Sequence, residues 1–528
     1  MGKRMKRQNI VMGTLILSAS SIFVRMLGFV FRIYLSNTMG AQGMGVYTLI
    51  LSLYGLCATV ATSGIAGAVS KLVAEELVRG KPQNGLRILR RAVGISLLIS
   101  CAVGVVMFVF AEPIGVYILK EPRTVLSLRL LAPGMPLMSV SSSLRGYFIA
   151  RRKVGNPATG QVVEQFVKMA FIVGLMGYWL PKGLEYGCAL VVLGITVGEV
   201  VCFLYSLGGF LWERTHERHR AKADIQGVTR KILGFAVPVS VSSYARSALR
   251  LLEDVLILSG LKKFSGKEDV ATGEYGSIKG MVMPLLTFPL SLLSAFVVTL
   301  TPEISRLHTT GNKARLENTI STILRYTSIV GMFVMCVFMS FSGELGEIIY
   351  KDAQVGEMLR ALSWLCPFMC VEMVTVSILQ GLGEQVSSLR YSVTDSVLRI
   401  ALVYVLIPYS GAKGFMLMVM ISNLYTPLLN LYRLLKVTHI RLKLGDWVLK
   451  PGLAALVTGQ MARLAYNYLL SPHMGMWQAT IAGVALAVAL FCVILFALGI
   501  VSPRDFKWIF SRLRRPGKAL SAEPEKAY

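Results

Sequence analysis

Fourteen long apolar stretches, separated by short polar links, dominate this sequence. A helix needs about 20 apolar residues to cross the hydrocarbon core of a bilayer. Each stretch is about that long, so the pattern predicts an all-α polytopic membrane protein. The predicted transmembrane helices are residues 10–36, 44–70, 88–111, 125–149, 158–180, 185–211, 230–259, 277–301, 319–341, 357–382, 389–408, 412–435, 449–470 and 475–499.

The composition agrees with a chain that is surrounded by lipid. Apolar residues make up 54% of the 528 residues and charged residues 16%, whereas soluble proteins have about 45–50% and about 25%. The mean hydropathy is +0.61. The polar surface is too small to cover a soluble protein of this size, so lipid must contact much of the chain.

The net charge of +27 raises nucleic acid as a partner, but the distribution of the basic residues argues against it. They form short clusters in alternate links, as expected for the cytoplasmic links of a membrane protein. This asymmetry predicts a multi-pass protein with both termini in the cytoplasm, and a first span that is retained instead of cleaved as a signal peptide. The clusters lie at residues 3–7, 79–91, 151–153, 214–222, 313–315, 436–443 and 504–518.

Sequence signatures of metal sites, disulfides and enzymes are missing. The eight cysteines all fall in apolar stretches, and only Cys366 and Cys370 are close together, which favours apolar packing. The five histidines lie scattered in predicted links. The chain contains no phosphate loop, nucleophile elbow or HExxH motif. We therefore expect no enzyme activity, no cofactor and no metal site.

The sequence contains an internal repeat. Ser70-Lys71 matches Ser305-Arg306, and Leu144-Arg-Gly146 matches Leu379-Gln-Gly381, both 235 residues later. Parallel repeats of six spans are a transporter architecture. We therefore predict two pseudosymmetric six-helix lobes and two added helices, with residues 1–222 as the first lobe, 223–440 as the second, 441–501 as the last two spans and 502–528 as a cytoplasmic tail.

Four arginines lie inside the first and seventh spans, where a charge is costly. Arg25 and Arg32 share one helix face in the first span, as do Arg246 and Arg250 in the seventh. Guanidinium groups bind phosphate oxygens in pairs, so the four predict a cationic cavity for a di- or pyrophosphate group. The alternatives are snorkelling to a head group and salt bridges within a helix, for which Glu253 and Asp254 are suitably placed in the seventh span.

The remaining acids within spans are candidates for ion coupling or for structural pairs. Glu164 with Lys168, and Asp395 with Arg399, are four residues apart and match each other in the repeat, which favours neutralised pairs inside a bundle. Glu199 and Glu372 are isolated acids that can take up H⁺ or a cation. With Glu253, Asp254 and Asp395 they form the set of coupling candidates, and Asp254 and Asp395 together offer oxygen ligands for Na⁺.

Several motifs resemble one family of transporters. The run from Ser21 to Ile33, the run Met39-Gly-Ala-Gln-Gly-Met-Gly-Val-Tyr47, the run Gly64-Ile-Ala-Gly-Ala-Val-Ser-Lys71 and the run Leu379-Gln-Gly-Leu-Gly383 are similar to the multidrug/oligosaccharidyl-lipid/polysaccharide (MOP) exporter superfamily. Within it, they look like the branch of stage V sporulation protein B and the MurJ lipid II flippases. The resemblance covers essentially the whole chain.

The resemblance implies alternating access around a central cavity in the bacterial cytoplasmic membrane. It implies translocation of an undecaprenyl-pyrophosphate-linked peptidoglycan precursor by a monomeric transporter, and Arg25 would contact the pyrophosphate. Arg32 departs from the MurJ-like pattern, because Ile33 stands where an Asp usually follows. Two alternatives are a cation-coupled multidrug antiporter on the same fold, which would need an acidic cavity, and a non-transporting scaffold of a wall-synthesis complex.

Overall fold

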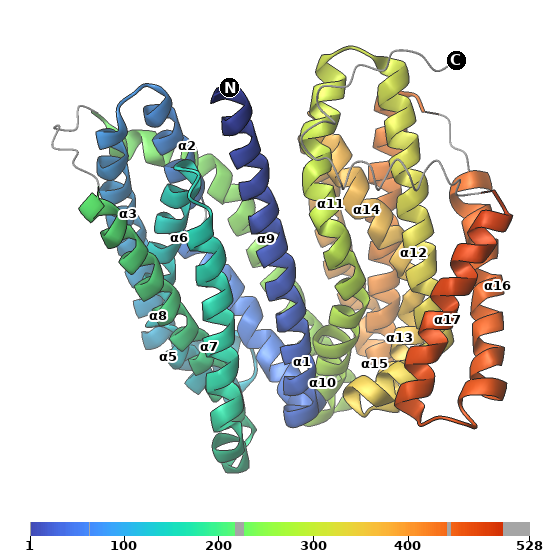
Figure 1. Ribbon diagram of the computed structural model, residues 1–528. Helices are drawn as coiled ribbons and strands as arrows, with labels where there is room; N and C mark the ends of the chain where they lie inside the picture. The colour runs from blue at the N-terminus through green and yellow to red at the C-terminus, as the bar shows by residue number, and fades with distance from the viewer. Residues whose placement is uncertain (1, 63, 217–225, 441–444, 500–528) are drawn as a thin grey trace. The chain divides into compact units, whose positions relative to one another are not determined.

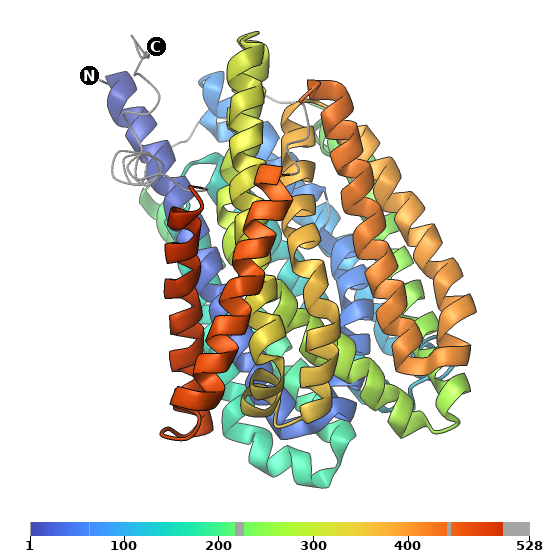
Figure 2. The same ribbon diagram turned by 90° about the vertical axis from the view of Figure 1, so that its right-hand side faces the viewer.

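The computed structural model describes residues 2–62, 64–216, 226–440 and 445–499 (Figures 1 and 2). Within these ranges every regular element is a helix, which confirms the predicted all-α class. The predicted tail at 502–528 lies outside the described residues. The predicted lobe boundaries after residues 222 and 440 also fall at undescribed segments, so that division stays a prediction.

The described chain forms two compact units. The first contains residues 1–280 and 407–412. Its main helices are α1 (Gly2–Thr62), α2 (Ile65–Val78), α3 (Pro82–Val109), α5 (Val125–Leu131), α6 (Gly134–Ala150), α7 (Gly155–Trp179), α8 (Leu184–His216), α9 (Val228–Ser265) and α10 (Glu268–Tyr275). Short elements between them are α4 (Ala111–Pro113), η1 (Ile114–Ile118), η2 (Pro122–Thr124) and η3 (Leu180–Lys182). The π-helix η4 (Gly276–Val282) follows α10.

The second unit contains residues 281–406 and 413–528. Its helices are α11 (Met283–Thr309), α12 (Lys313–Tyr350), α13 (Ala353–Leu362), η5 (Ser363–Leu365), α14 (Cys366–Gly381), most of α15 (Gln385–Thr438), η6 (Gly445–Leu449), α16 (Lys450–Ala465), η7 (Tyr466–Leu470) and α17 (Met476–Ala497). The last two spans, α16 and α17, pack on each other and on α12, as both views show (Figures 1 and 2).

Ten helices of the described chain are long and apolar enough to cross a membrane, or eleven if the bent pair Pro122–Leu131 and Gly134–Ala150 forms one span. This confirms a multi-pass protein but not the count of fourteen. Two of the ten are double length, because α1 and α15 each continue through a break in helical geometry, at Gly40 and Gly411. Both breaks fall in links that the sequence predicts. The predicted span 449–470 is divided between α16 and the π-helix η7.

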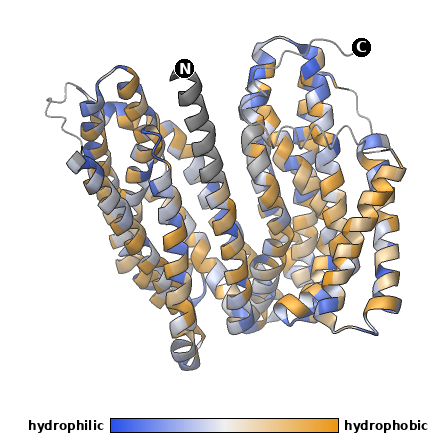
Figure 3. Cartoon of the chain, viewed as in Figure 1, coloured by the Kyte–Doolittle hydropathy of each residue, from blue (hydrophilic) through white to orange (hydrophobic). Residues whose placement is uncertain are grey.

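Apolar residues predominate along the long helices, and many polar residues lie near their ends and links (Figure 3). Large aliphatic side chains are exposed on several spans: Leu98 is 72% exposed, and Val405 and Val493 are each 64% exposed. Water would make such surfaces unfavourable, so they are the faces that contact lipid.

Two glycine contacts support the internal repeat. A Cβ atom at Gly146 would lie 2.5 Å from the carbonyl oxygen of Ala66. A Cβ atom at Gly381 would lie 2.8 Å from the carbonyl oxygen of Thr301. Both residues of the second pair come 235 positions after those of the first (381 minus 146, and 301 minus 66). The same close helix packing therefore recurs at matched positions, once in each unit.

Candidate functional site

A lysine inserted between two buried acids forms the centre of the first unit's polar interior. The Nζ atom of Lys279 lies 2.8 Å from Oδ1 of Asp254 and 3.6 Å from Oε1 of Glu253. Asp254 is 2% exposed and Glu253 is 6% exposed. Buried charges need close partners to offset their lost hydration. The two acids therefore pair with Lys279, and the intrahelical salt bridge from Arg250 to Asp254 does not form among the described contacts.

Two hydroxyl groups complete this cluster. Ser52 of α1 donates a hydrogen bond to Oδ2 of Asp254. The fully buried Tyr275 of α10 interacts electrostatically with Asp254. The cluster therefore contains polar groups from four elements: α1, α9, α10 and the π-helix η4. Single π-helical turns occur often at functional sites, and here one carries Lys279.

Glycines bring these elements into backbone contact. A Cβ atom at Gly45 of α1 would overlap the carbonyl oxygen of Thr272, and one at Gly276 would overlap the carbonyl oxygen of Ala41. Only glycine permits such an approach. This close packing of α1 against α10 and η4 holds Ser52 and Lys279 within reach of the same carboxylate.

The four predicted substrate-binding arginines lie apart from this cluster. Arg25, Arg246 and Arg250 are exposed, and Arg32 is half-buried. Among the described residues, Arg32, Arg246 and Arg250 form no ion pair with an acid. On α9 the arginines are one and two helical turns closer to the N-terminal end than the acids. Their guanidinium groups therefore remain available in a span where an unneutralised charge is costly.

The face of α9 that contacts α1 is polar along its length. Tyr244 donates a hydrogen bond to the carbonyl oxygen of Val60 (3.3 Å), and the hydroxyls of Ser247 and Thr59 lie 3.1 Å apart. Together with the Ser52–Asp254 hydrogen bond, these contacts run antiparallel along the two helices. They fix the rotation of α9, and hence the direction in which Arg246 and Arg250 project.

A second cluster in the first unit contains Glu164, Lys168 and Glu199. Glu199 of α8 accepts a hydrogen bond from the hydroxyl of Tyr54 (3.4 Å) and interacts electrostatically with Glu164 and Lys168 of α7. Glu164 and Lys168 interact electrostatically, without a direct ion pair among the described contacts. Arg145 of α6 also interacts electrostatically with Glu199, so two acids and two bases lie together inside this helix bundle.

The second unit contains a related cluster. Glu372 of α14 interacts electrostatically with Asp395 and Arg399 of α15, and Ser422 donates a 2.7 Å hydrogen bond to Asp395. Here two acids accompany one base. Asp254 and Asp395, the predicted Na⁺ ligands, lie in different units with different partners. No group of three His, Cys, Asp or Glu side chains suited to a metal ion occurs in the described chain.

A network of ion pairs surrounds Glu121, which is 1% exposed. Glu121 accepts a 2.6 Å hydrogen bond from Arg123 and a 3.2 Å one from Thr272 of α10. Arg123 also pairs with Asp269 at 3.0 Å, and Lys262 pairs with Glu268 at 3.0 Å. The network fastens the link that follows η1 to the adjoining ends of α9 and α10.

The run Leu379–Gly383 ends α14 in a tight turn. Gly383 has a φ of +85°, which favours glycine, and Glu384 comes directly after it. Glu384 pairs with Arg433 at 2.9 Å. The hydrogen bond from Ser387 and the ion pair with Arg433 hold the pKa of the Glu384 carboxyl below its usual range. This motif therefore forms a link between α14 and α15 that hydrogen bonds and an ion pair hold in place.

Sequence reasoning missed the partners of the predicted residues. Lys279, Ser52 and Tyr54 were not singled out, although a single lysine at the start of an apolar span was a usable signal for the first. The Glu121 network joins residues about 140 positions apart, which no local pattern reports. Glu303 and Arg306, three residues apart in α11, form an ion pair at 2.8 Å. The substrate-binding and coupling roles of the predicted residues remain predictions.

Comparison with known families gives a direct match. The sequence model of the family described as "Polysaccharide biosynthesis protein" matches residues 10–308, which is more than half of the chain. The model described as "MatE" matches residues 247–405.

Individual relatives agree with this match. Stage V sporulation protein B of Bacillus subtilis (strain 168) is 26% identical over 452 residues, which cover 84% of this chain and 87% of that protein. Lipid II flippase MurJ of the same organism is 23% identical over 435 residues, which cover 77% of this chain and 78% of that protein.

Solved structures show the same fold. A structure of the lipid II flippase MurJ in an inward closed conformation has a TM-score of 0.66 and 14% identity, and covers 91% of this chain and 98% of that one. An inward-facing multidrug resistance MATE family transporter of the MOP superfamily has a TM-score of 0.60 and 15% identity, with 79% and 98% covered. The chain belongs to the polysaccharide biosynthesis protein family and is a multi-pass transporter in the stage V sporulation protein B and MurJ branch of the MOP superfamily.

Proposed function

We propose that this protein is a flippase for an undecaprenyl-pyrophosphate-linked peptidoglycan precursor, lipid II or a related oligosaccharide lipid, in cell-wall or spore cortex synthesis. It would act by alternating access in the cytoplasmic membrane, with both termini on the cytoplasmic side. One observation carries the proposal: Arg246 and Arg250 are exposed and unneutralised on α9, whereas the acids of the same helix are buried against Lys279.

The free-energy cost of a charge within a membrane span explains why this observation points to an anionic substrate. A central charge within a span costs about 2.5–3.5 kcal/mol on insertion scales, and an aqueous cavity or an anionic ligand offsets that cost. Arginine binds phosphate oxygens bidentately, and a pyrophosphate offers several such oxygens. Arg25 and Arg32 of α1 would add two more guanidinium groups, and the lipid chains would stay in the bilayer.

Transport energy would come from ion binding at the clusters around Glu199 and Glu372. Binding of one H⁺ or Na⁺ at Glu199 in the first unit, or at Glu372 in the second, would neutralise a carboxylate inside the helix bundle. A change of conformation would then be linked to ion entry.

A cation-coupled multidrug antiporter is the second candidate, and the match to the MatE model favours it. It requires exposed acids for cationic drugs. In the described chain, the exposed charges on α9 are all basic: Arg230, Lys231, Arg246, Arg250 and Lys263. A basic helix supports the flippase instead.

Depletion of the protein in its native cell tests the proposal. We expect lipid-linked peptidoglycan precursor to accumulate in the cytoplasmic leaflet, with no change in resistance to cationic drugs. Altered drug resistance with unchanged precursor levels would contradict the proposal and favour the antiporter. Normal precursor levels together with unchanged resistance would favour the scaffold.

A further inference from the structure

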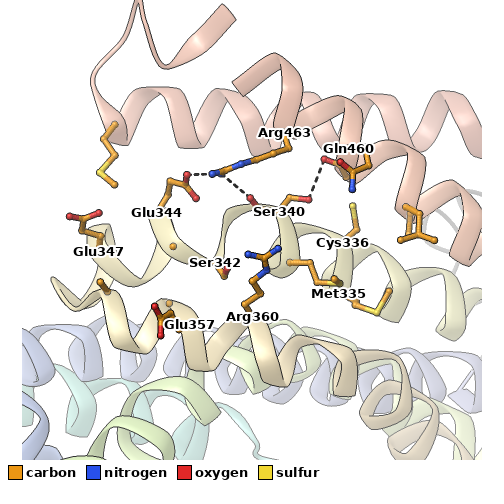
Figure 4. A pocket seen from close by; sticks show the side chains of 18 residues that line it. Met335, Cys336, Ser340, Ser342, Glu344, Glu347, Glu357, Arg360, Gln460 and Arg463 are labelled. Carbon is orange, nitrogen blue, oxygen red and sulfur yellow. Dashed lines mark hydrogen bonds and ion pairs between the residues drawn. The ribbon is translucent and has the colours of Figure 1, made fainter. Parts of the chain in front are cut away.

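The second unit contains a cavity of about 480 Å³ that lies apart from all the residues discussed above. It is bounded by α12, α13, α16 and the start of α17 (Figure 4). This volume is within the range of small-molecule sites. Because all its lining residues belong to one unit, its shape does not depend on how the units are arranged.

The lining of the cavity combines apolar and charged side chains. Met335 and Met339 of α12, Leu456 of α16 and Met476 of α17 are apolar. The charged members are three glutamates and two arginines: Glu344, Glu347, Glu357, Arg360 and Arg463. An amphiphile has this combination of surfaces, with a charged head group attached to an apolar body.

The charges divide into a closed pair and an open set. Arg463 pairs with Glu344 at 2.5 Å and donates a 3.0 Å hydrogen bond to the carbonyl oxygen of Ser340, as Figure 4 shows. Glu347, Glu357 and Arg360 are exposed, and their side chains make no hydrogen bond or ion pair with any described residue. The cavity therefore offers one guanidinium and two carboxylates to a ligand.

A ligand that satisfies this open set must carry both an anion and a cation. Arg360 projects from α13 toward the space beside α12 and α16 (Figure 4), and Glu357 of the same helix also lines the cavity. A phosphate would pair with the Arg360 guanidinium, and a nearby primary ammonium would donate hydrogen bonds to Glu347 and Glu357. A metal ion suits the set less well, because an arginine is part of it and no suitable group of three ligands occurs among the described residues.

Neighbouring side chains place the cavity at the level of lipid head groups. Trp477 at the start of α17 is 61% exposed, and Tyr468 of η7 is 74% exposed. Exposed Trp and Tyr side chains mark the interface between membrane and water. Leu453 and Leu464 of α16 are also more than half exposed, so the cavity adjoins a surface that contacts acyl chains.

We infer that this cavity binds the head group of a bilayer phospholipid that has a primary amine and a phosphate, such as phosphatidylethanolamine. The phosphate lies at Arg360, the ammonium lies at Glu347 and Glu357, and the glycerol and upper acyl chains lie along Met335, Met339 and Met476. The lipid would fasten α16 to α13. This inference is independent of the transported substrate.

Native mass spectrometry of the purified full-length protein with defined phospholipids tests the inference. We expect phosphatidylethanolamine to bind at least tenfold more tightly than phosphatidylglycerol, which lacks the ammonium, and than phosphatidylcholine, whose quaternary nitrogen has no N–H donor. R360Q should weaken phosphatidylethanolamine binding about tenfold, and the double variant E347Q/E357Q should remove the preference over phosphatidylcholine. R390Q on α15 and E317Q at the other end of α12 are matched controls outside the cavity, and should leave both values unchanged.

Equal binding of phosphatidylglycerol and phosphatidylethanolamine to the wild-type protein would overturn the inference, and so would unchanged binding in R360Q. If a variant does not fold, the wild-type protein alone decides the question with a series of head groups carrying one, two or three N-methyl groups. We expect affinity to fall with each lost N–H donor. A flat series would contradict the inference.

Discussion

Lys279 and Asp254, 25 residues apart in the sequence, form a 2.8 Å ion pair inside the first unit. The pair connects the π-helix η4 to α9, and Ser52 connects it to α1. Asp254 therefore pairs with Lys279 and not with the arginines one and two turns away on α9. The acids of this helix are thus neutralised, whereas its arginines Arg246 and Arg250 are available to a ligand.

Lys279→Ala should therefore destabilise the protein strongly. Breaking a buried pair by removing one partner costs about 3–5 kcal/mol, because the other charge stays buried without compensation. We expect a large fall in the melting temperature of the detergent-solubilised protein. Lys263→Gln, at an exposed position of α9, is the control and should melt like the wild type. The double variant K279A/D254A should lose less than the sum of the single variants, and additive losses would show that the two residues are not coupled.

Arg123→Gln should destabilise the protein more than Arg129→Gln. Arg123 is the main ionic partner of Glu121, whose side chain is 1% exposed, whereas Arg129 and Glu112 form a 3.9 Å pair with 48% and 72% of their side chains exposed. Buried partners are costly to lose and exposed pairs contribute about 0–1 kcal/mol. Thermal melting of the two variants checks this. Equal melting temperatures would mean that the Glu121 network contributes no more than a surface pair.

Glu199→Gln and Glu372→Gln should each weaken the dependence of translocation on an ion gradient. Each removes a carboxylate inside the helix bundle that would take up H⁺ or Na⁺. Translocation in proteoliposomes with and without imposed H⁺ and Na⁺ gradients measures this dependence. Glu112→Gln, at an exposed acid, is the control. If both cluster variants respond to the gradients as the wild type does, neither glutamate is a coupling site.

Gly146→Ala and Gly381→Ala should both lower stability, by about 1–3 kcal/mol each, because a Cβ atom would crowd a backbone carbonyl of the neighbouring helix. Thermal melting measures the loss. Gly94→Ala in α3 meets no atom within 4 Å and should be neutral or slightly stabilising. Similar losses at Gly146 and Gly381 are expected from the repeat, and a loss at only one of them would argue against equivalent packing.

The sequence allowed the helices and the links to be predicted, because apolar length and link residues are local signals. The breaks at Gly40 and Gly411 lie where the polar links predict them, and the repeat was visible in polar residues whose spacing is kept. The count of fourteen spans differs from the ten or eleven of the structure, because α15 continues through Gly411 as one helix and α16 ends at Ala465, where a π-helix begins.

The partners of the charged residues could not be predicted from local spacing. Asp254 lies four residues after Arg250, a spacing that allows a salt bridge within one helix. The bound partner is instead Lys279, which α10 and η4 deliver through backbone contacts at Gly45 and Gly276. Such a choice depends on tertiary packing. The cavity beside Arg360 was also invisible in the sequence, because four separate helices form it.

Translocation of lipid II by the purified protein in proteoliposomes tests the central claim most directly. The assay compares the wild type with Arg25→Ala and Arg250→Ala, and Arg315→Ala at an exposed end of α12 is the control. We expect the wild type and the control to move labelled lipid II, and each of the other two variants to do so at least tenfold more slowly, because each loses charge-assisted contacts to the pyrophosphate. No translocation by the folded wild type, or equal rates in all four proteins, would contradict the claim.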